Sequence, residues 1–218
     1  MILFFETETS DLIRTDVALT DPQQPWAVAI AAELCDDDSN RVAGIDTLIR
    51  AEGRRIAKKA EARHRISAKA SERHGILEVR AMATLAGLAG KATHIVGYDM
   101  EFSRDVILGV LKRGGKKPTL WTRPGLEFVS LIKPCALMCG LPSTEETGEP
   151  KLPTRNEACR IMLNEEPVPD LPEGAPVAAA MARLIAKVGQ AKRLYRHLVE
   201  RGALESVGDV PASLERRT

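Results

Sequence analysis

Two glutamates near the start of the chain are the residues best placed to do chemistry. Glu6 and Glu8 directly follow the apolar residues 2–5, a run that predicts a buried strand. Because side chains alternate along a strand, the two carboxylates project from the same face. Two like charges this close disfavour joint ionisation unless a cation lies between them, and Mg²⁺ prefers oxygen ligands. The pair therefore indicates either a metal site or carboxylates that a neighbouring Arg or Lys neutralises.

The elements that must position this pair begin with a small antiparallel sheet. Residues 26–35 and 41–50 are predicted as the second and third strands, and the Asp-rich residues 36–40 between them as a turn. Further on, residues 93–97 and 121–123 predict two short strands that alternate with helices over 79–88 and 105–113. Such alternation is typical of parallel strands. The pattern therefore predicts an α/β fold with a central mixed five-stranded sheet flanked by helices.

The last third of the chain is predicted to be helical, with proline-rich joints. Helices are expected over residues 154–163 and 178–201, with a loop of four prolines over 165–176. The second helix ends before Gly202, a residue that suits a left-handed cap. We therefore expect one domain over residues 1–201 and a C-terminal tail over 202–218.

Composition limits the partners of the chain. Its 218 residues carry a net charge of +1, so any affinity for nucleic acid must come from local patches. Residues 50–73 form such a patch and are predicted as a basic surface helix, with these candidate phosphate contacts: Arg54, Arg55, Lys58, Lys59 and Arg63. A solvated face is the alternative, because aromatic residues for base stacking make up only 4% of the chain. No apolar stretch is long enough for a membrane span or signal peptide, so a soluble, cytoplasmic protein without membrane association is expected.

Four segments together resemble the motifs of the DEDD-type 3′→5′ exonucleases, which have an RNase H-like fold. Phe4-Phe5-Glu6-Thr7-Glu8-Thr9-Ser10 resembles their first motif, Asp-Thr-Glu-Thr-Thr-Gly. His64-Arg65-Ile66-Ser67 falls where these proteins often have His-Gly-Ile-Thr, and residues 95–103 resemble Val-Gly-His-Asn-x-x-Phe-Asp. Lys151-Leu152 resembles the Lys-Leu segment that precedes the third motif. The likeness runs in order over residues 2 to 190.

The resemblance implies a two-metal phosphodiesterase, but several of the residues that it requires are replaced. In the family, four carboxylates hold two divalent ions and a His or Tyr of the third motif acts as general base. Here Ser103 stands in place of the second-motif Asp. The third motif aligns best with residues 176–181, which leaves Pro176 in place of the base and Met181 in place of the ligand. Losing two carboxylates and the base predicts little or no hydrolysis.

Two acidic residues near Ser103 are candidates to replace the lost ligand. Asp99 stands where the family usually has Asn, and Asp105 follows Ser103 by two residues. Each also has an ordinary interpretation, because Ser103 is a suitable N-cap and Asp105 a favourable acid in the first turn of the helix that follows. The predicted metal ligands are therefore Glu6, Glu8, Asp99 and Asp105, and the predicted cofactor is either none or a single weakly bound Mg²⁺ or Mn²⁺.

These observations predict an exonuclease-like protein with an inactive or crippled site, retained for binding nucleic acid or a partner protein. One alternative is a working exonuclease that uses the substituted carboxylates with a base yet to be assigned. A second is a protein-interaction module without affinity for nucleic acid. Proteins with this resemblance commonly form homodimers, and the residues of this chain leave its oligomeric state open.

Overall fold

A single five-stranded sheet organises the chain. The computed structural model describes residues 1–143 and 148–204. The strands follow the spatial order β3-β2-β1-β4-β5, with these bounds: β1 (Ile2–Thr9), β2 (Ala27–Cys35), β3 (Arg41–Leu48), β4 (His94–Gly97) and β5 (Glu127–Ser130). β2 pairs antiparallel with both β1 and β3, whereas β4 pairs parallel with β1 and β5. The predicted mixed sheet and its opening meander are confirmed.

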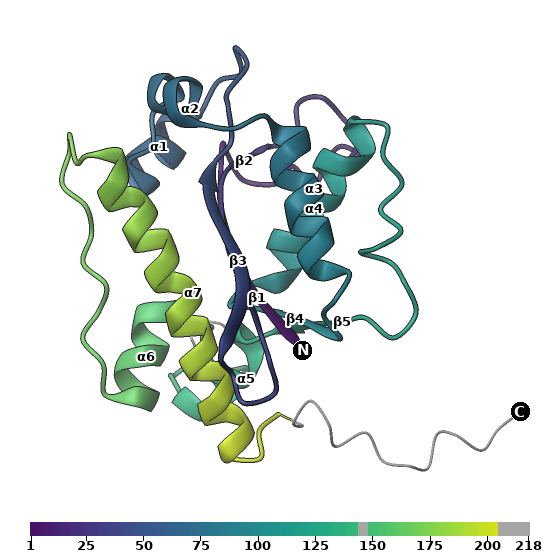
Figure 1. Ribbon diagram of the computed structural model, residues 1–218. Helices are drawn as coiled ribbons and strands as arrows, with labels where there is room; N and C mark the ends of the chain where they lie inside the picture. Colours follow the sequence, from purple (N-terminus) through teal and green to yellow (C-terminus); the bar gives the residue numbers. More distant parts are fainter. Residues whose placement is uncertain (144–147, 205–218) are drawn as a thin grey trace, which may run out of the picture.

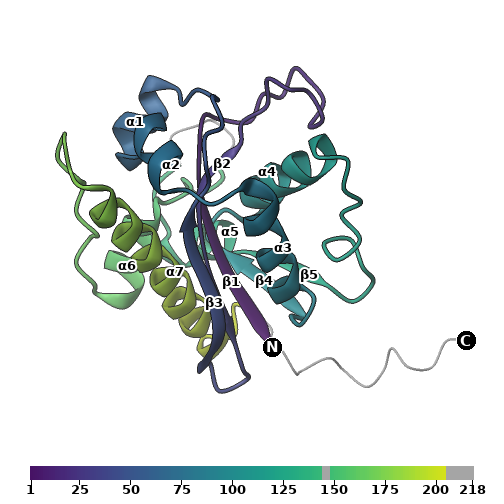
Figure 2. The ribbon, with the colours of Figure 1, turned by 45° about the horizontal axis from the view of Figure 1, so that its top comes forward.

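Helices cover both faces of the sheet and the end of β1 (Figure 1). α7 lies across one face together with α6 and α5, and α3 and α4 lie on the other, as the second view also shows (Figure 2). α1 and α2 lie beyond the end of β1, where the Ala57 N–H donates to the Ser10 carbonyl at 2.8 Å. The helix bounds are α1 (Lys58–His64), α2 (Ala68–His74), α3 (Glu78–Ala89), α4 (Met100–Arg113), α5 (Ile132–Cys139), α6 (Arg155–Leu163) and α7 (Val177–Glu200).

The central strand β1 is buried on both faces, which explains its unbroken apolar start. Phe4 packs edge-on against Tyr195 of α7, with ring centroids 5.7 Å apart. Phe5 points to the opposite face and packs against Trp121 at 6.3 Å. Since alternate residues share a face, Glu6 and Glu8 lie on the same side as Phe4 and face α7. Two carboxylates are thereby placed under the longest helix of the protein.

The structure corrects three of the predicted elements. Residues 121–123 form no strand; Trp121 is a buried core residue, and the fifth strand lies a few residues later at β5. The basic segment forms the two short helices α1 and α2, because Arg65 adopts a left-handed conformation (φ 62°) that ends α1. α4 begins earlier than expected: Asp99 is its N-cap, and Ser103 lies inside the helix.

The predicted domain boundary falls close to the end of α7. That helix ends at Glu200 and is followed by Gly202 with a positive φ of 69°. Most of the predicted tail, residues 205–218, lies outside the described residues. In the described ranges, no helix combines the length and the apolar character that crossing a bilayer requires.

Candidate functional site

The Glu6 carboxylate is fully engaged by two groups from distant parts of the chain. Its Oε1 accepts a hydrogen bond from the Tyr98 backbone N–H at 3.0 Å. Its Oε2 accepts from Nη2 of Arg155 at 2.5 Å, in an ion pair whose side chains are 8% and 14% exposed. The Arg155 guanidinium also lies over the Tyr98 ring, 5.1 Å from its centroid. A guanidinium therefore neutralises the first of the two predicted metal ligands.

The Glu8 carboxylate forms a second ion pair, with the ammonium of Lys187 on α7. Burial alone would raise the pKa of Glu8, but the charge and hydrogen bond of Lys187 outweigh it, so the pKa of this carboxyl lies below its usual value. Burial lowers the pKa of Lys187, and Glu8 opposes that shift. The two side chains are only 6% and 15% exposed, so this pair is almost completely removed from water.

His64 is a third ionisable group beside this pair. Its Nδ1 accepts a hydrogen bond from the Ile66 backbone N–H at 3.0 Å, which requires a ring without a proton on Nδ1. Burial lowers the pKa of His64, while the Glu8 charge raises it and the Lys187 charge lowers it. Its Nε2 is buried without a hydrogen-bond partner among the described residues. The sequence indicated His64 only as part of a motif, whereas the structure places it next to Glu8.

Local features of α6 and α7 fix the two cations. Arg155 is the first residue of α6, directly after a capping box in which the Thr154 side chain and Glu157 satisfy each other's backbone N–H groups. Lys187 lies in the middle of α7, which buries one stripe against the sheet: Ala180, Leu184, Val188, Ala191, Tyr195 and Leu198. Both cations are therefore held by well-defined helices.

The structure does not gather the four predicted metal ligands into one group. Asp99 is exposed, and its side chain accepts from the Phe102 N–H as the N-cap of α4, whereas Asp105 pairs with Arg104 at 3.4 Å. Within residues 1–143 and 148–204, no group of three or more His, Cys, Asp or Glu side chains is arranged to hold a metal ion. The donor set at Glu6 and Glu8 consists of two carboxylates that each already have a cation.

The residues aligned with the third motif have structural roles. Pro176 is the N-cap residue of α7, and Met181 packs against the hydrophobic core. Ser103, which stands in place of the second-motif Asp, is buried within α4, with 5% of its surface exposed. None of these three side chains carries a charge or an acid-base group suited to activate water at neutral pH.

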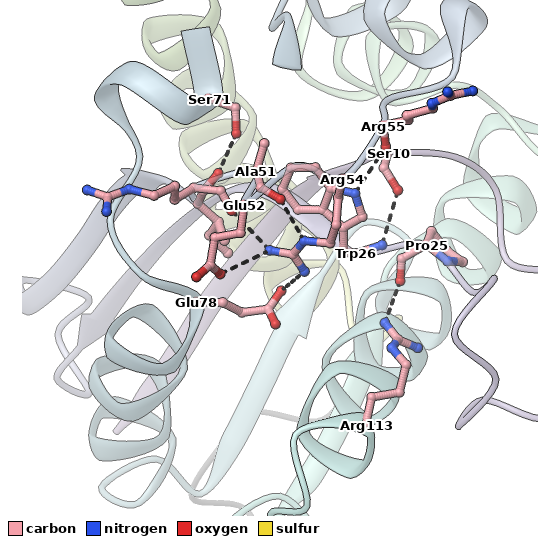
Figure 3. Close-up of polar contacts among 12 residues, drawn as sticks. Ser10, Pro25, Trp26, Ala51, Glu52, Arg54, Arg55, Ser71, Glu78 and Arg113 are labelled. Atoms are coloured by element: carbon pink, nitrogen blue, oxygen red, sulfur yellow. Dashed lines mark hydrogen bonds and ion pairs between the residues drawn. The ribbon is translucent and has the colours of Figure 1, made fainter. Parts of the chain in front are cut away.

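The basic segment separates into an internal part and an exposed part. The Arg54 guanidinium pairs with Glu78 at 2.7 Å, lies 4.2 Å from the Trp26 ring centroid, and donates to the Ala51 carbonyl (Figure 3). Arg54 therefore connects the β3–α1 segment to α3. The other four predicted contacts are exposed, and their side chains form no ion pair or hydrogen bond with any described residue: Arg55, Lys58, Lys59 and Arg63.

Sequence reasoning missed Arg155 and Lys187 as site residues. They lie 149 and 179 positions away from their glutamate partners, so no local spacing connects the members of either pair. The only available signal was general: two adjacent buried carboxylates need cations, and a neighbouring Arg or Lys was one of the two interpretations left open. The structure shows that this interpretation describes the geometry.

Comparison with known proteins gives structural relatives alone. No protein-family model and no curated protein matches the chain. Exonuclease I of E. coli in complex with an oligonucleotide is 16% identical, with a TM-score of 0.64 over 91% of this chain. Exonuclease I of Methylocaldum szegediense is also 16% identical, with a TM-score of 0.67 over 92% of this chain. A complex of exonuclease I with SSB-Ct is 18% identical, with a TM-score of 0.58 over 91%.

The chain spans about 40% of the length of these exonuclease I chains: 40%, 40% and 43%. At this level of identity the likeness concerns the fold. The RNase H-like fold read from four motifs is thus confirmed, and its structural neighbours are exonuclease I proteins of the DEDD 3′→5′ exonuclease superfamily.

Proposed function

We propose that this protein is an exonuclease-fold protein that does not hydrolyse phosphodiester bonds and that binds single-stranded nucleic acid through its basic surface. The observation that carries the proposal is the pairing of both strand carboxylates with cations of the protein itself. Arg155 and Lys187 occupy the ligand oxygens that divalent ions would need. The residues present therefore do not fit a two-metal centre.

A metal ion at this position would have to displace a buried basic side chain from its carboxylate partner. Removing one partner of a buried ion pair leaves an uncompensated charge, at a cost of about 3 to 5 kcal/mol. A divalent ion that captured Glu8 would leave the Lys187 ammonium buried without its carboxylate. Mg²⁺ also requires near-ideal octahedral oxygen geometry, which two carboxylates on one strand do not supply. The cost of an unpaired Lys187 and the unsuitable ligand geometry both oppose metal binding at this position.

The proposed binding activity is supported by the exposed cations of α1 and the residues before it. Lys and Arg side chains without carboxylate partners attract phosphate and release counterions from the nucleic acid. The exonuclease I neighbours include E. coli structures in complex with oligonucleotides, which supports the same class of ligand for this fold.

The catalytic half of the proposal is tested by digestion of an end-labelled single-stranded oligonucleotide in Mg²⁺ and in Mn²⁺. We expect no shortening beyond that of a Glu8→Ala variant purified in parallel. Metal-dependent shortening by the wild type that this variant loses would establish the alternative, a working exonuclease with substituted ligands.

The binding half is tested by gel-shift titration at two salt concentrations. A phosphate binder weakens as salt rises, because counterions released into a more concentrated salt solution gain less entropy. Absence of a shift at low salt would contradict the proposal and favour a protein-interaction module. One of the exonuclease I structures that share this fold is a complex with SSB-Ct, and this observation favours the second alternative.

A further inference from the structure

A hollow of about 600 Å³ lies beyond the end of β1, outside the Glu6 and Glu8 pairs. Its walls come from Ser10 and Asp11 after β1, the loop before β2, the segment that leads into α1, and the last residue of α4, Arg113. Figure 3 shows Arg54 and Arg55, which are consecutive in the segment before α1, and Arg113, which comes from α4 and points toward Pro25. Its volume is within the range of pockets that hold small molecules.

The lining of this hollow is strongly cationic although the whole chain has a net charge of only +1. Four basic residues line it, Arg54, Arg55, Lys58 and Arg113, against one carboxylate, Asp11. Glu78 pairs with Arg54, but no described carboxylate lies within ion-pairing distance of the other three. The hollow therefore carries positive charge that the protein does not neutralise.

Arg113 shows that part of this charge is built into the fold. Its Nη1 donates to the Leu19 carbonyl at 2.9 Å and its Nη2 to the Pro25 carbonyl at 2.8 Å. These bonds fix a partly buried guanidinium without offsetting its charge. Burial lowers the pKa of Arg113, the Glu78 charge raises it, and the Arg54 charge lowers it. An anion in the hollow would relieve the cost of holding this charge away from water.

We propose that this hollow holds one phosphate-bearing nucleotide unit of a bound single strand, an inference that rests on the proposed function. Lys58 lines the hollow and is also the first residue of α1, so the exposed Lys59 and Arg63 continue the positive surface along that helix. Apolar side chains at Pro22, Pro25 and Ile56 give a sugar or base a surface to contact. The strand thus follows α1 away from the hollow.

The test compares two double variants with the same change in charge. Arg55→Ala/Lys58→Ala removes the two exposed cations of the hollow, and Lys69→Ala/Arg73→Ala removes two exposed cations of α2 that do not line it. Affinity for a labelled oligothymidylate is measured by fluorescence anisotropy over a range of salt. We expect the first variant to lose about tenfold in affinity and to reduce the salt slope by roughly 1.4, for two phosphate contacts. The α2 variant should change affinity by less than about twofold.

The two tryptophans supply a readout of position. Both rings are buried, but only Trp26 lines the hollow, where its indole N–H donates to the Arg55 carbonyl at 3.2 Å. Oligothymidylate should shift the indole NMR signal of Trp26 and leave that of Trp121 unchanged.

Each failure has a distinct signature. Equal losses in both double variants, or binding without a shift at Trp26, would overturn the hollow as the site and leave the proposed binding activity standing. Absence of binding by the wild type at low salt would overturn both. Urea unfolding of each variant checks its fold, and because all four side chains are exposed, both should match the wild type.

Discussion

The pairing of Glu8 with Lys187 is the contact on which the proposed absence of a metal centre mainly depends. Both side chains are nearly excluded from water, so each depends on the other for compensation of its charge. The neighbouring pair of Glu6 and Arg155 repeats the arrangement and adds a backbone donor from Tyr98. The charges that a divalent ion would bring are already supplied by the chain.

Removal of one member of the pair should destabilise the protein more than removal of both. Lys187→Met leaves the Glu8 charge buried and alone, and we expect it to lower the free energy of unfolding by about 3 kcal/mol. Glu8→Gln/Lys187→Met leaves no uncompensated charge and should lower it by less. Urea unfolding of Glu8→Gln, Lys187→Met and the double variant gives the coupling energy between the two side chains. Additive effects would show that the ion pair is not formed in solution.

The lowered pKa of Glu8 predicts loss of stability in acid. In the unfolded chain this carboxyl takes up a proton near its ordinary value of 4.5, whereas in the folded protein Lys187 keeps it ionised to lower pH. Its stabilising contribution is therefore complete above pH 4.5 and is lost as the pH falls through the folded pKa. The free energy of unfolding should fall more steeply below pH 4.5 for the wild type than for Glu8→Gln/Lys187→Met. Parallel curves would contradict the assignment.

At the scale of single elements, α4 gives a direct test of what Asp99 does. Its side chain accepts a hydrogen bond from the Phe102 N–H at 3.3 Å and caps the helix, although the sequence predicted it as a metal ligand. Asp99→Ala should cost about 1 kcal/mol in the free energy of unfolding, and Asp99→Asn, which retains the cap, less than about 0.5 kcal/mol. Thermal unfolding with and without Mn²⁺ measures both. Asp99 would be a metal ligand if Mn²⁺ raised the melting temperature of the wild type but not that of Asp99→Asn.

The elements show which parts of the fold sequence patterns can predict. The start of the strand β1 and both ends of the helix α7 were predicted within one residue, because each carries a clear apolar pattern. The fifth strand was misplaced because Trp121 and its neighbours have β-forming side chains, but Trp121 is used to pack against Phe5. The break between α1 and α2 was missed because Arg65 takes a left-handed conformation that usually favours Gly or Asn.

At the candidate site too, some residues could be predicted from the sequence and others could not. The replacement of the third-motif base by Pro176 and of its ligand by Met181 stays a prediction that rests on the alignment. Glutamates two residues apart on a strand can be read locally from the sequence. Their counterions cannot, because Arg155 and Lys187 come next to β1 only after α6 and α7 have packed. Long-range pairing of this kind depends on tertiary contacts that a single sequence does not display.

Over the whole molecule, the chain shares the fold of exonuclease I, and both of its strand glutamates are paired with basic side chains. The mixed five-stranded sheet flanked by helices is the architecture that the sequence resemblance predicted. The centre of that scaffold now holds two salt bridges, and the exposed positive charge lies beyond the end of β1 and along α1. These two features together are the basis of the binding function that we propose.

The central claim is tested most directly by soaking crystals of the protein in Mn²⁺ and recording anomalous scattering. We expect Arg155 and Lys187 to remain paired with Glu6 and Glu8, and no anomalous peak to appear between the two carboxylates. A pair of Mn²⁺ peaks there, with the two basic side chains displaced, would contradict it.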